Sequence, residues 1–165
     1  MKRERPLSAA WINSLPPSQR RKTLDELSRH DIEMLDGSWK TWAREEQLAP
    51  PGLWRIWLFL GGRGSGKTRA GAEWVAAGIR AGAMRRVALI AATFHDARSV
   101  MIEGVAGLLA VSPGAAYEPS NARVKWVGSG AIAHVLSAEE PDSIRGHQFD
   151  AAWCDGDRAP KRAPR

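Results

Sequence analysis

Cysteine and long apolar runs are scarce in this chain of 165 residues. Its one cysteine, Cys154, excludes an internal disulfide and suits a reducing cytoplasm. No apolar run approaches the roughly 20 residues that a membrane-spanning helix needs. The basic start at residues 1–5 is not followed by an apolar core of signal-peptide length. These absences predict a cytoplasmic protein that does not act in a membrane.

The chain also lacks a continuous basic stripe, although its net charge is +6. Residues 156–165 hold four basic side chains and one acidic one, so half of the excess charge lies there. Residues 1–50 are nearly balanced, with nine basic and eight acidic side chains. Charge alone is therefore poor evidence for nucleic-acid binding. The four histidines lack the spacing of zinc ligands, so we infer no zinc site.

What is present is the composition of one globular domain, with 44% hydrophobic and 25% charged residues. The eight tryptophans are best interpreted as core and layer-packing residues. Alternating patterns predict helices over residues 18–36, 39–47, 67–81 and 95–111. They predict strands over residues 53–60, 87–92, 122–127, 131–138 and 149–155. Strands that alternate with helices predict an α/β fold with a mostly parallel sheet covered on both faces.

The most specific chemistry lies in residues 53–74, LWRIWLFLGGRGSGKTRAGAEW, where an expected strand leads through a glycine-rich loop into a helix. The loop has the pattern G-x-x-x-x-G-K-T, which is the phosphate-binding loop of nucleoside triphosphatases. Its glycines let successive N–H groups point at an anion, and the helix N-terminus adds partial positive charge. The predicted nucleotide-binding residues are Gly61, Gly62, Arg63, Gly64, Ser65, Gly66, Lys67 and Thr68.

Two of these residues have defined roles in such loops. Lys67 is expected to reach the β- and γ-phosphates of ATP, and the Thr68 hydroxyl is expected to ligate Mg²⁺. Arg63 leaves two alternatives open, contact with the γ-phosphate or simple solvation.

A second nucleotide motif is indicated by FDAAWCD, a small apolar strand that ends in Asp155. An aspartate at this place holds Mg²⁺ through water, although a strand-terminal aspartate is also common in ordinary turns. Many ATPases place a glutamate next, to polarise the attacking water, but here the residue is Gly156. Loss of a general base typically removes about 10²- to 10⁴-fold of rate. The sequence therefore predicts nucleotide binding with impaired hydrolysis.

Two further residues each have two interpretations, one as a functional residue and one as an ordinary surface residue. Arg145, just before the last expected strand, is either an arginine finger for a neighbouring subunit's γ-phosphate or a surface arginine. Gln47, shortly before the first expected strand, is either a contact to an adenine edge or a solvated glutamine at a helix end.

The order of these motifs resembles the ATPase domain of phage terminase large subunits, and most of all the packaging proteins of prophages and gene transfer agents. The resemblance rests on WAREEQLAPPGLWRIWLFLGGRGSGKTRAGAEW, LIAAT, YEPSNARVKW, SAEEPDSIRG and FDAAWCD, within residues 38–155. It implies a P-loop three-layer sandwich of the motor-ATPase type with an additional strand. It also implies ATP and Mg²⁺ as cofactors, Gln47 as an adenine contact and Arg145 as a finger in trans.

The resemblance also implies partners and an assembly. Such motors form a homo-oligomeric ring on a portal protein, work with a small terminase subunit and drive double-stranded DNA into a head. The expected organisation here is an N-terminal lead and helix over residues 1–37, a partial ATPase domain over residues 38–155, and a basic tail over residues 156–165.

This sequence departs from the family pattern after Asp155. The family continues with a catalytic glutamate, the rest of the sheet and a nuclease domain, whereas this chain continues GDRAPKRAPR. The tail has no apolar pattern, which suggests an out-of-frame segment that begins at Gly156. In similar motors the next strand inserts between the strand of Asp155 and that of the phosphate loop. We therefore expect a marginally stable chain with exposed strand edges.

The leading hypothesis is thus an ATP-binding fragment of a terminase large subunit with little hydrolysis and no nuclease. One alternative is a non-catalytic module that interacts with other parts of the packaging machine. A second alternative is a small P-loop kinase, although no arginine-rich lid segment is apparent.

Overall fold

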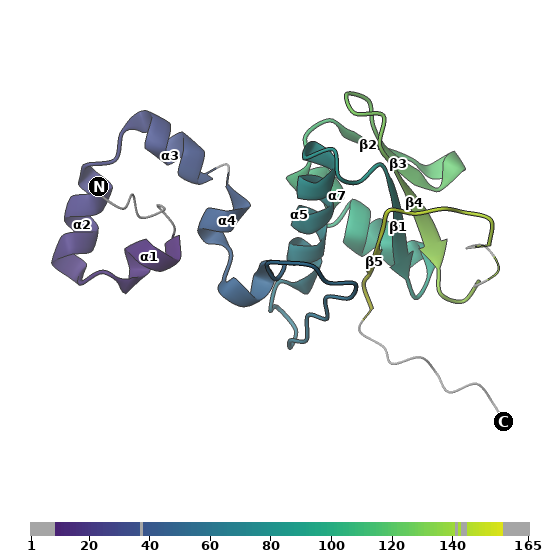
Figure 1. The fold of residues 1–165 in the computed structure, drawn as a ribbon, viewed down its shortest axis with the longest axis horizontal. Coiled ribbons are helices and arrows are strands. Elements are labelled where there is room, and N and C mark those ends of the chain that lie inside the picture. Colours follow the sequence, from purple (N-terminus) through teal and green to yellow (C-terminus); the bar gives the residue numbers. More distant parts are fainter. Residues whose placement is uncertain (1–8, 37, 141, 143–144, 157–165) are drawn as a thin grey trace. The chain divides into compact units, whose positions relative to one another are not determined.

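The computed structural model describes residues 9–36, 38–140, 142 and 145–156 of the chain. These residues divide into two compact units, residues 1–59 and 60–165, which are described separately (Figure 1). The tail expected over residues 156–165 lies outside the described residues except for Gly156.

The first unit consists of short helices and loops. Its elements in chain order are α1 (Ala9–Ser14), α2 (Pro17–Asp25), α3 (Arg29–Asp36), α4 (Trp39–Trp42) and the 3₁₀ turn η1 (Glu45–Gln47). Helix α1 lies within the expected flexible lead, so this part of the prediction was wrong. The helix expected over residues 39–47 is interrupted at Ala43, whose backbone is extended.

The helix expected over residues 18–36 is divided in two by a local capping motif. The Ser28 hydroxyl accepts a hydrogen bond from the backbone N–H of Asp31 at 3.1 Å. The Asp31 carboxylate in turn accepts one from the backbone N–H of Ser28 at 3.0 Å. This reciprocal arrangement is a capping box, which favours the start of a new helix, α3, after Ser28.

The second unit contains a five-stranded mixed sheet in the order β2-β3-β4-β1-β5. Strand β1 (Arg86–Ala91) lies parallel to both β4 (Ile132–Ser137) and β5 (Ala151–Cys154). Strands β2 (Ala115–Glu118) and β3 (Arg123–Trp126) continue the sheet in antiparallel pairs beyond β4. The prediction of a mostly parallel sheet was therefore only partly right, because tight connections between β2, β3 and β4 permit only antiparallel neighbours.

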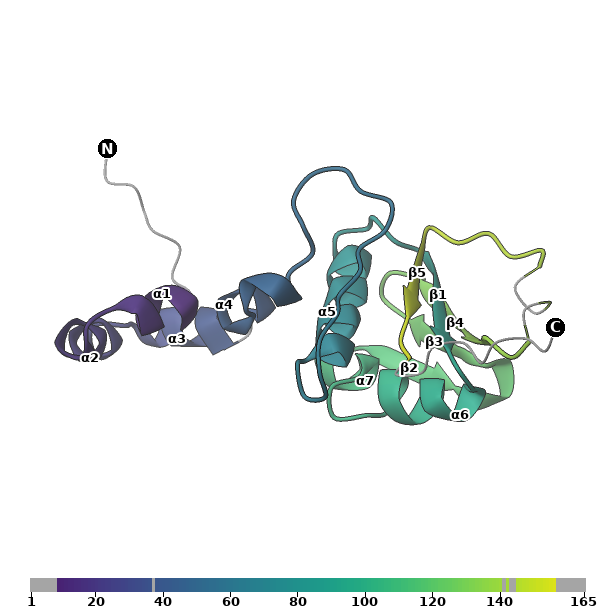
Figure 2. The same cartoon turned by 90° about the horizontal axis from the view of Figure 1, so that it is seen from below.

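The core lies between one face of this sheet and the helices (Figure 2). Helix α5 (Lys67–Arg80), the π-helical segment η2 (Ala97–Ile102) and α7 (Leu108–Val111) supply its helical side. The largest fully buried side chains are Val75, Val87, Leu89, Met101, Ile102, Leu108 and Val124. Among the described residues, no helix covers the opposite face, so the expected two-sided cover is wrong for this part of the chain.

Several sequence predictions are confirmed in this unit. Helix α5 begins at Lys67 and ends at Arg80, and Gly82 follows with a φ of +70°. Strand β1 occupies the expected apolar run, and β3 and β4 form the expected pair around the glycine-rich turn 128–130. The helix expected over residues 95–111 is broken into α6 (Phe94–Asp96), η2 and α7, with Gly104 and Gly107 at the break.

The strand expected over residues 53–60 does not form, which is the largest correction to the predicted fold. Leu53, Ile56, Leu58 and Leu60 are exposed, and no strand of the described sheet pairs with this segment. An apolar run becomes a strand only where neighbours accept its backbone hydrogen bonds. Within the described part of the chain, β5 has one neighbour, β1, and its other edge is unpaired.

No helix in the described part of the chain has the length and apolar character needed to cross a membrane.

Candidate functional site

The glycine-rich loop follows the geometry that its sequence demands. Gly64 and Gly66 have φ values of +78° and +86°, which only glycine adopts at little cost. The Ser65 N–H donates to the Gly62 carbonyl at 3.2 Å, closing a turn. Gly66 then caps α5, so the N–H groups of the first helical turn follow directly from the loop. This arrangement is suited to binding an anion.

Lys67, the first residue of α5, returns over the loop that precedes it. Its Nζ donates to the carbonyl oxygens of Gly61 at 2.9 Å and Gly62 at 3.1 Å. These contacts hold the ammonium group beside the glycine turn. An anion seated in the loop would therefore meet this charge as well as the helix N-terminus.

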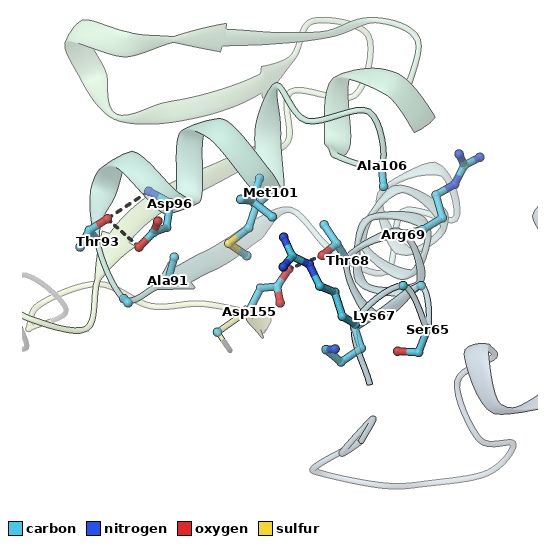
Figure 3. A pocket seen from close by; sticks show the side chains of 16 residues that line it. Ser65, Lys67, Thr68, Arg69, Ala91, Thr93, Asp96, Met101, Ala106 and Asp155 are labelled. Atoms are coloured by element: carbon cyan, nitrogen blue, oxygen red, sulfur yellow. Dashed lines mark hydrogen bonds between the residues drawn. The ribbon is translucent and has the colours of Figure 1, made fainter. Parts of the chain in front are cut away.

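Thr68 and Asp155 meet at the centre of the site (Figure 3). The Thr68 hydroxyl donates to Oδ2 of Asp155 at 2.8 Å, and both residues are half-buried. Asp155 directly follows β5, and its backbone N–H donates to the Ile90 carbonyl at 3.0 Å. This hydrogen bond extends the β1–β5 pairing by one step and holds the aspartate at the carboxyl end of the parallel strands, where α/β proteins commonly bind ligands.

A cavity of about 580 Å³ opens at this place, within the usual size range of ligand sites. One wall is the glycine-rich loop and the start of α5, from Arg63 to Arg69. The opposite wall follows β1 and η2, and Figure 3 shows Thr93, Asp96 and Met101 on that side. Asp155 and Gly156 close the space between the two walls.

Sequence reasoning missed three polar residues in the cavity walls. The Arg69 guanidinium donates to Oε1 of the buried Glu73 through Nε at 3.0 Å and Nη2 at 2.8 Å. Thr93 caps α6, because its hydroxyl accepts from the Asp96 N–H and donates to the Asp96 carboxylate. The position of Thr93 directly after an apolar strand was the available signal for its place in the wall.

Gly156 also lies in the cavity wall, directly after Asp155. A Cβ added at Gly156 would meet no atom within 4 Å, so a longer side chain has room there. Asp96, a second carboxylate of the wall, already accepts a hydrogen bond of 2.8 Å from the Thr93 hydroxyl through Oδ2. The wall therefore contains the carboxylate of Asp155, which could contact a metal ion. It contains no carboxylate at position 156, where a general base was expected.

Arg145 is not among the described residues that line the cavity. Gln47 belongs to the first unit, is buried, and accepts a hydrogen bond from the Arg44 N–H at 2.9 Å through its amide oxygen. Its interpretation as a solvated helix-end glutamine is therefore wrong. Arg145 is exposed and forms an ion pair with Asp142 at 3.1 Å. Their proposed contacts, with adenine and with a neighbouring subunit, stay predictions.

The residues that could hold a metal are few. Within residues 9–36, 38–140, 142 and 145–156, no group of three or more His, Cys, Asp or Glu side chains could hold a metal ion. The donor set of Thr68 and Asp155, one hydroxyl and one carboxylate, instead matches a hard cation that keeps water and phosphate oxygens as its other ligands, as Mg²⁺ does.

The fold and the cavity define an α/β protein with a glycine-rich loop that borders a cavity at the carboxyl end of its parallel strands. Residues 58–159, more than half of the chain, match the family described as terminase large subunit, T4likevirus-type, N-terminal. The chain therefore belongs to the terminase large-subunit family, and the resemblance to terminase large subunits inferred from the motifs is confirmed. Searches for similar curated proteins and for similar solved structures gave no match.

Proposed function

We propose that this chain is a Mg²⁺–ATP-binding module of a terminase large subunit. The observation that supports the proposal most strongly is the hydrogen bond between Thr68 and Asp155, because it joins two motif residues that the sequence separates by 87 positions. A further proposal is that residues 38–155 correspond to part of a P-loop three-layer sandwich, of which the described sheet is a portion.

The residues of the loop fit a bound nucleotide. Backbone N–H groups around Gly64 and Gly66, together with the start of α5, would hold phosphate oxygens. Lys67 would supply a mobile positive charge beside them, and Thr68 with Asp155 would orient Mg²⁺. When bound, the metal neutralises phosphate charge. Arg63, in the same wall, is placed for either a phosphate contact or solvent.

We propose that hydrolysis is slow, because Gly156 leaves the attacking water without the usual carboxylate. The packaging role, and the partners it entails, follow from family membership as proposals: portal protein, small terminase subunit and double-stranded DNA. A ring-shaped homo-oligomer is proposed on the same ground.

The experiment that tests the proposal is titration of the full chain with a fluorescent ATP analogue in the presence of Mg²⁺. Lys67→Ala removes the loop's side-chain cation, and we expect it to weaken binding by roughly tenfold or more, as expected for loss of one charge-assisted contact. Arg80→Ala removes an exposed arginine from the other end of α5 and is expected to leave binding unchanged. Equal affinities of the parent chain and Lys67→Ala would contradict the proposal.

A further inference from the structure

The sheet face opposite α5 carries a cluster of basic residues that the nucleotide cavity does not use. In the pairing register, Lys125 of β3 lies beside Ile132, which lies beside Arg86 of β1. Two residues along each strand, and so on the same face, Arg123 lies beside His134. Residues paired in register share a face of a sheet. We call this cluster, together with His147 and Phe149 that contact it, the basic face.

The acidic groups near the basic face are already engaged. Glu118 accepts from Arg123 Nε at 2.6 Å and from the Asn121 side chain at 3.2 Å. Asp150 accepts from the backbone N–H groups of Arg85 and Arg86 at 2.7 and 2.8 Å.

The remaining cations of this face have no acidic side chain paired with them in the described part of the chain. Arg86 is exposed and Lys125 is half-buried, and neither forms an ion pair there. The three cations of the face, Arg123 included, outnumber by one the nearby carboxylates of Glu118 and Asp150. Hydrogen bonds lower the pKa values of both carboxyl groups, and the charges of Lys125 and Arg86 lower them further.

Three rings gather beside these cations. The rings of His147 and Phe149 stack, with 5.5 Å between centroids and an interplanar angle of 16°. His134, on β4, lies against both, at 5.1 Å from His147 and 5.9 Å from Phe149. His147 is exposed, so the cluster presents an imidazole to solvent, and His134, which it contacts, is paired in register with Arg123.

We propose that the basic face binds single-stranded nucleic acid, with Arg86 and Lys125 contacting phosphates and an unpaired base stacking on the ring of His147. Cations beside an exposed ring are the chemistry that single strands require. A duplex hides the faces of its bases and would leave the ring cluster unused.

This surface is distinct from the nucleotide cavity. Arg86 is the first residue of β1, whereas the cavity lies beyond the last residue of the same strand. The proposal also goes beyond the double-stranded DNA of the packaging role, and it does not depend on ATP binding.

The test is fluorescence anisotropy of the full chain with a labelled oligothymidylate of about 15 nucleotides, a length within known single-strand site sizes. A duplex of the same length is the comparison. We expect the single strand to bind at least about fivefold more tightly, the effect of one stacked base. Equal or tighter binding of the duplex would overturn the proposal.

Charge-neutral variants test the phosphate contacts. Arg86→Gln with Lys125→Gln should reduce the slope of log affinity against log salt by about 1.4, since each phosphate contact to a single strand contributes about 0.7. Arg80→Gln, an exposed arginine on α5, is the matched control and should leave the slope unchanged. An unchanged slope in the double variant would overturn the proposal.

His147→Ala tests stacking at an exposed position where folding is little affected. It should weaken single-strand binding by about fivefold or more without changing duplex binding. Phe149→Leu removes the ring that stacks on His147 and should also weaken single-strand binding. Its thermal unfolding midpoint, compared with that of the parent chain, checks that the variant is folded. Excess Mg²⁺–ATP should not displace the oligonucleotide, and displacement would instead assign binding to the cavity. Oligonucleotide binding without ATP binding would contradict the proposed function alone.

Discussion

The Thr68 hydroxyl donates a hydrogen bond of 2.8 Å to Oδ2 of Asp155. Thr68 is the second residue of α5 and Asp155 directly follows β5, so two elements that are distant in the chain place a hydroxyl and a carboxylate together. Neither residue alone indicates a metal site, since threonines at helix starts and aspartates after strands are common. Their contact inside one cavity is what makes the pair interpretable as Mg²⁺ ligands.

Thr68→Ala should weaken Mg²⁺-dependent nucleotide binding by roughly tenfold or more, because a ligand hydroxyl is lost next to a charged group. Thr68→Ser keeps the hydroxyl and should retain most of the affinity. Calorimetric titration with ATP, with and without Mg²⁺, distinguishes the two. If Thr68→Ala lost the same affinity in both conditions, the residue would act on folding or phosphate rather than on the metal.

Gly156→Glu should raise ATP hydrolysis, because it restores a carboxylate at the place where the attacking water needs a base. The expected gain is about 10²-fold, the lower end of the range for general-base catalysis. The position has room, since no atom lies within 4 Å of an added Cβ. Phosphate release under single-turnover conditions measures it, and Gly156→Gln, similar in size but not basic, should show no gain.

Gly71→Ala should destabilise the second unit. A Cβ at Gly71 would overlap the indole of Trp153, a buried residue of β5. Overpacking of this kind typically costs about 1–3 kcal/mol of unfolding free energy. Urea denaturation measures the change, and Gly128→Ala, where an added Cβ meets nothing within 4 Å, is the control. Adding Trp153→Phe should recover part of the loss, and no recovery would argue against the overlap as its cause.

Ser112→Ala should also destabilise the core. The Ser112 hydroxyl accepts a buried hydrogen bond of 2.7 Å from Nε1 of Trp126. Removing it leaves the indole N–H without that acceptor, which costs about 1–3 kcal/mol. Ser120→Ala, at an exposed position, should change the unfolding free energy little. The double variant with Trp126→Phe tests the cause, because the added loss should be much smaller when no N–H remains.

Stability should fall as pH drops from 7.5 towards 5, in part through His134. Burial lowers the pKa of His134 below its ordinary value, and the nearby charges of His147, Arg123 and Arg86 lower it further. The unfolded chain therefore takes up a proton near pH 6.5, while the folded chain resists until a lower pH. The unfolding free energy decreases across this interval and levels off below the folded-state pKa.

His134→Gln should flatten the profile between pH 5 and about 7.5, an interval set by the ordinary histidine pKa. His95→Gln, at an exposed position, is the matched control. Backbone N–H donors lower the pKa of Asp150, so its contribution is lost only at more acidic pH. An unchanged slope in His134→Gln would show that another group carries the dependence.

Local patterns predicted the second unit better than the first. Helix α5, strands β1 and β5, and the β3–β4 pair follow from apolar periodicity and from glycines that only turns require. The division between α2 and α3 depends on a pair of hydrogen bonds between Ser28 and Asp31. The spacing of these two residues is that of a capping box, which is the sequence signal for the division. Strand β2, four residues long, is too short to have a clear period.

The glycine-rich loop and the membership of the chain in the terminase large-subunit family were determined by the sequence itself. Close backbone approach to an anion needs glycines at set positions, so the spacing of the glycines by itself predicts the backbone conformation of the loop. Only the tertiary structure decided that Thr68 and Asp155 meet, and that residues 53–60 form no strand. A strand is stable through hydrogen bonds to neighbours remote in the chain, and the apolar character of a segment does not reveal whether those neighbours are present.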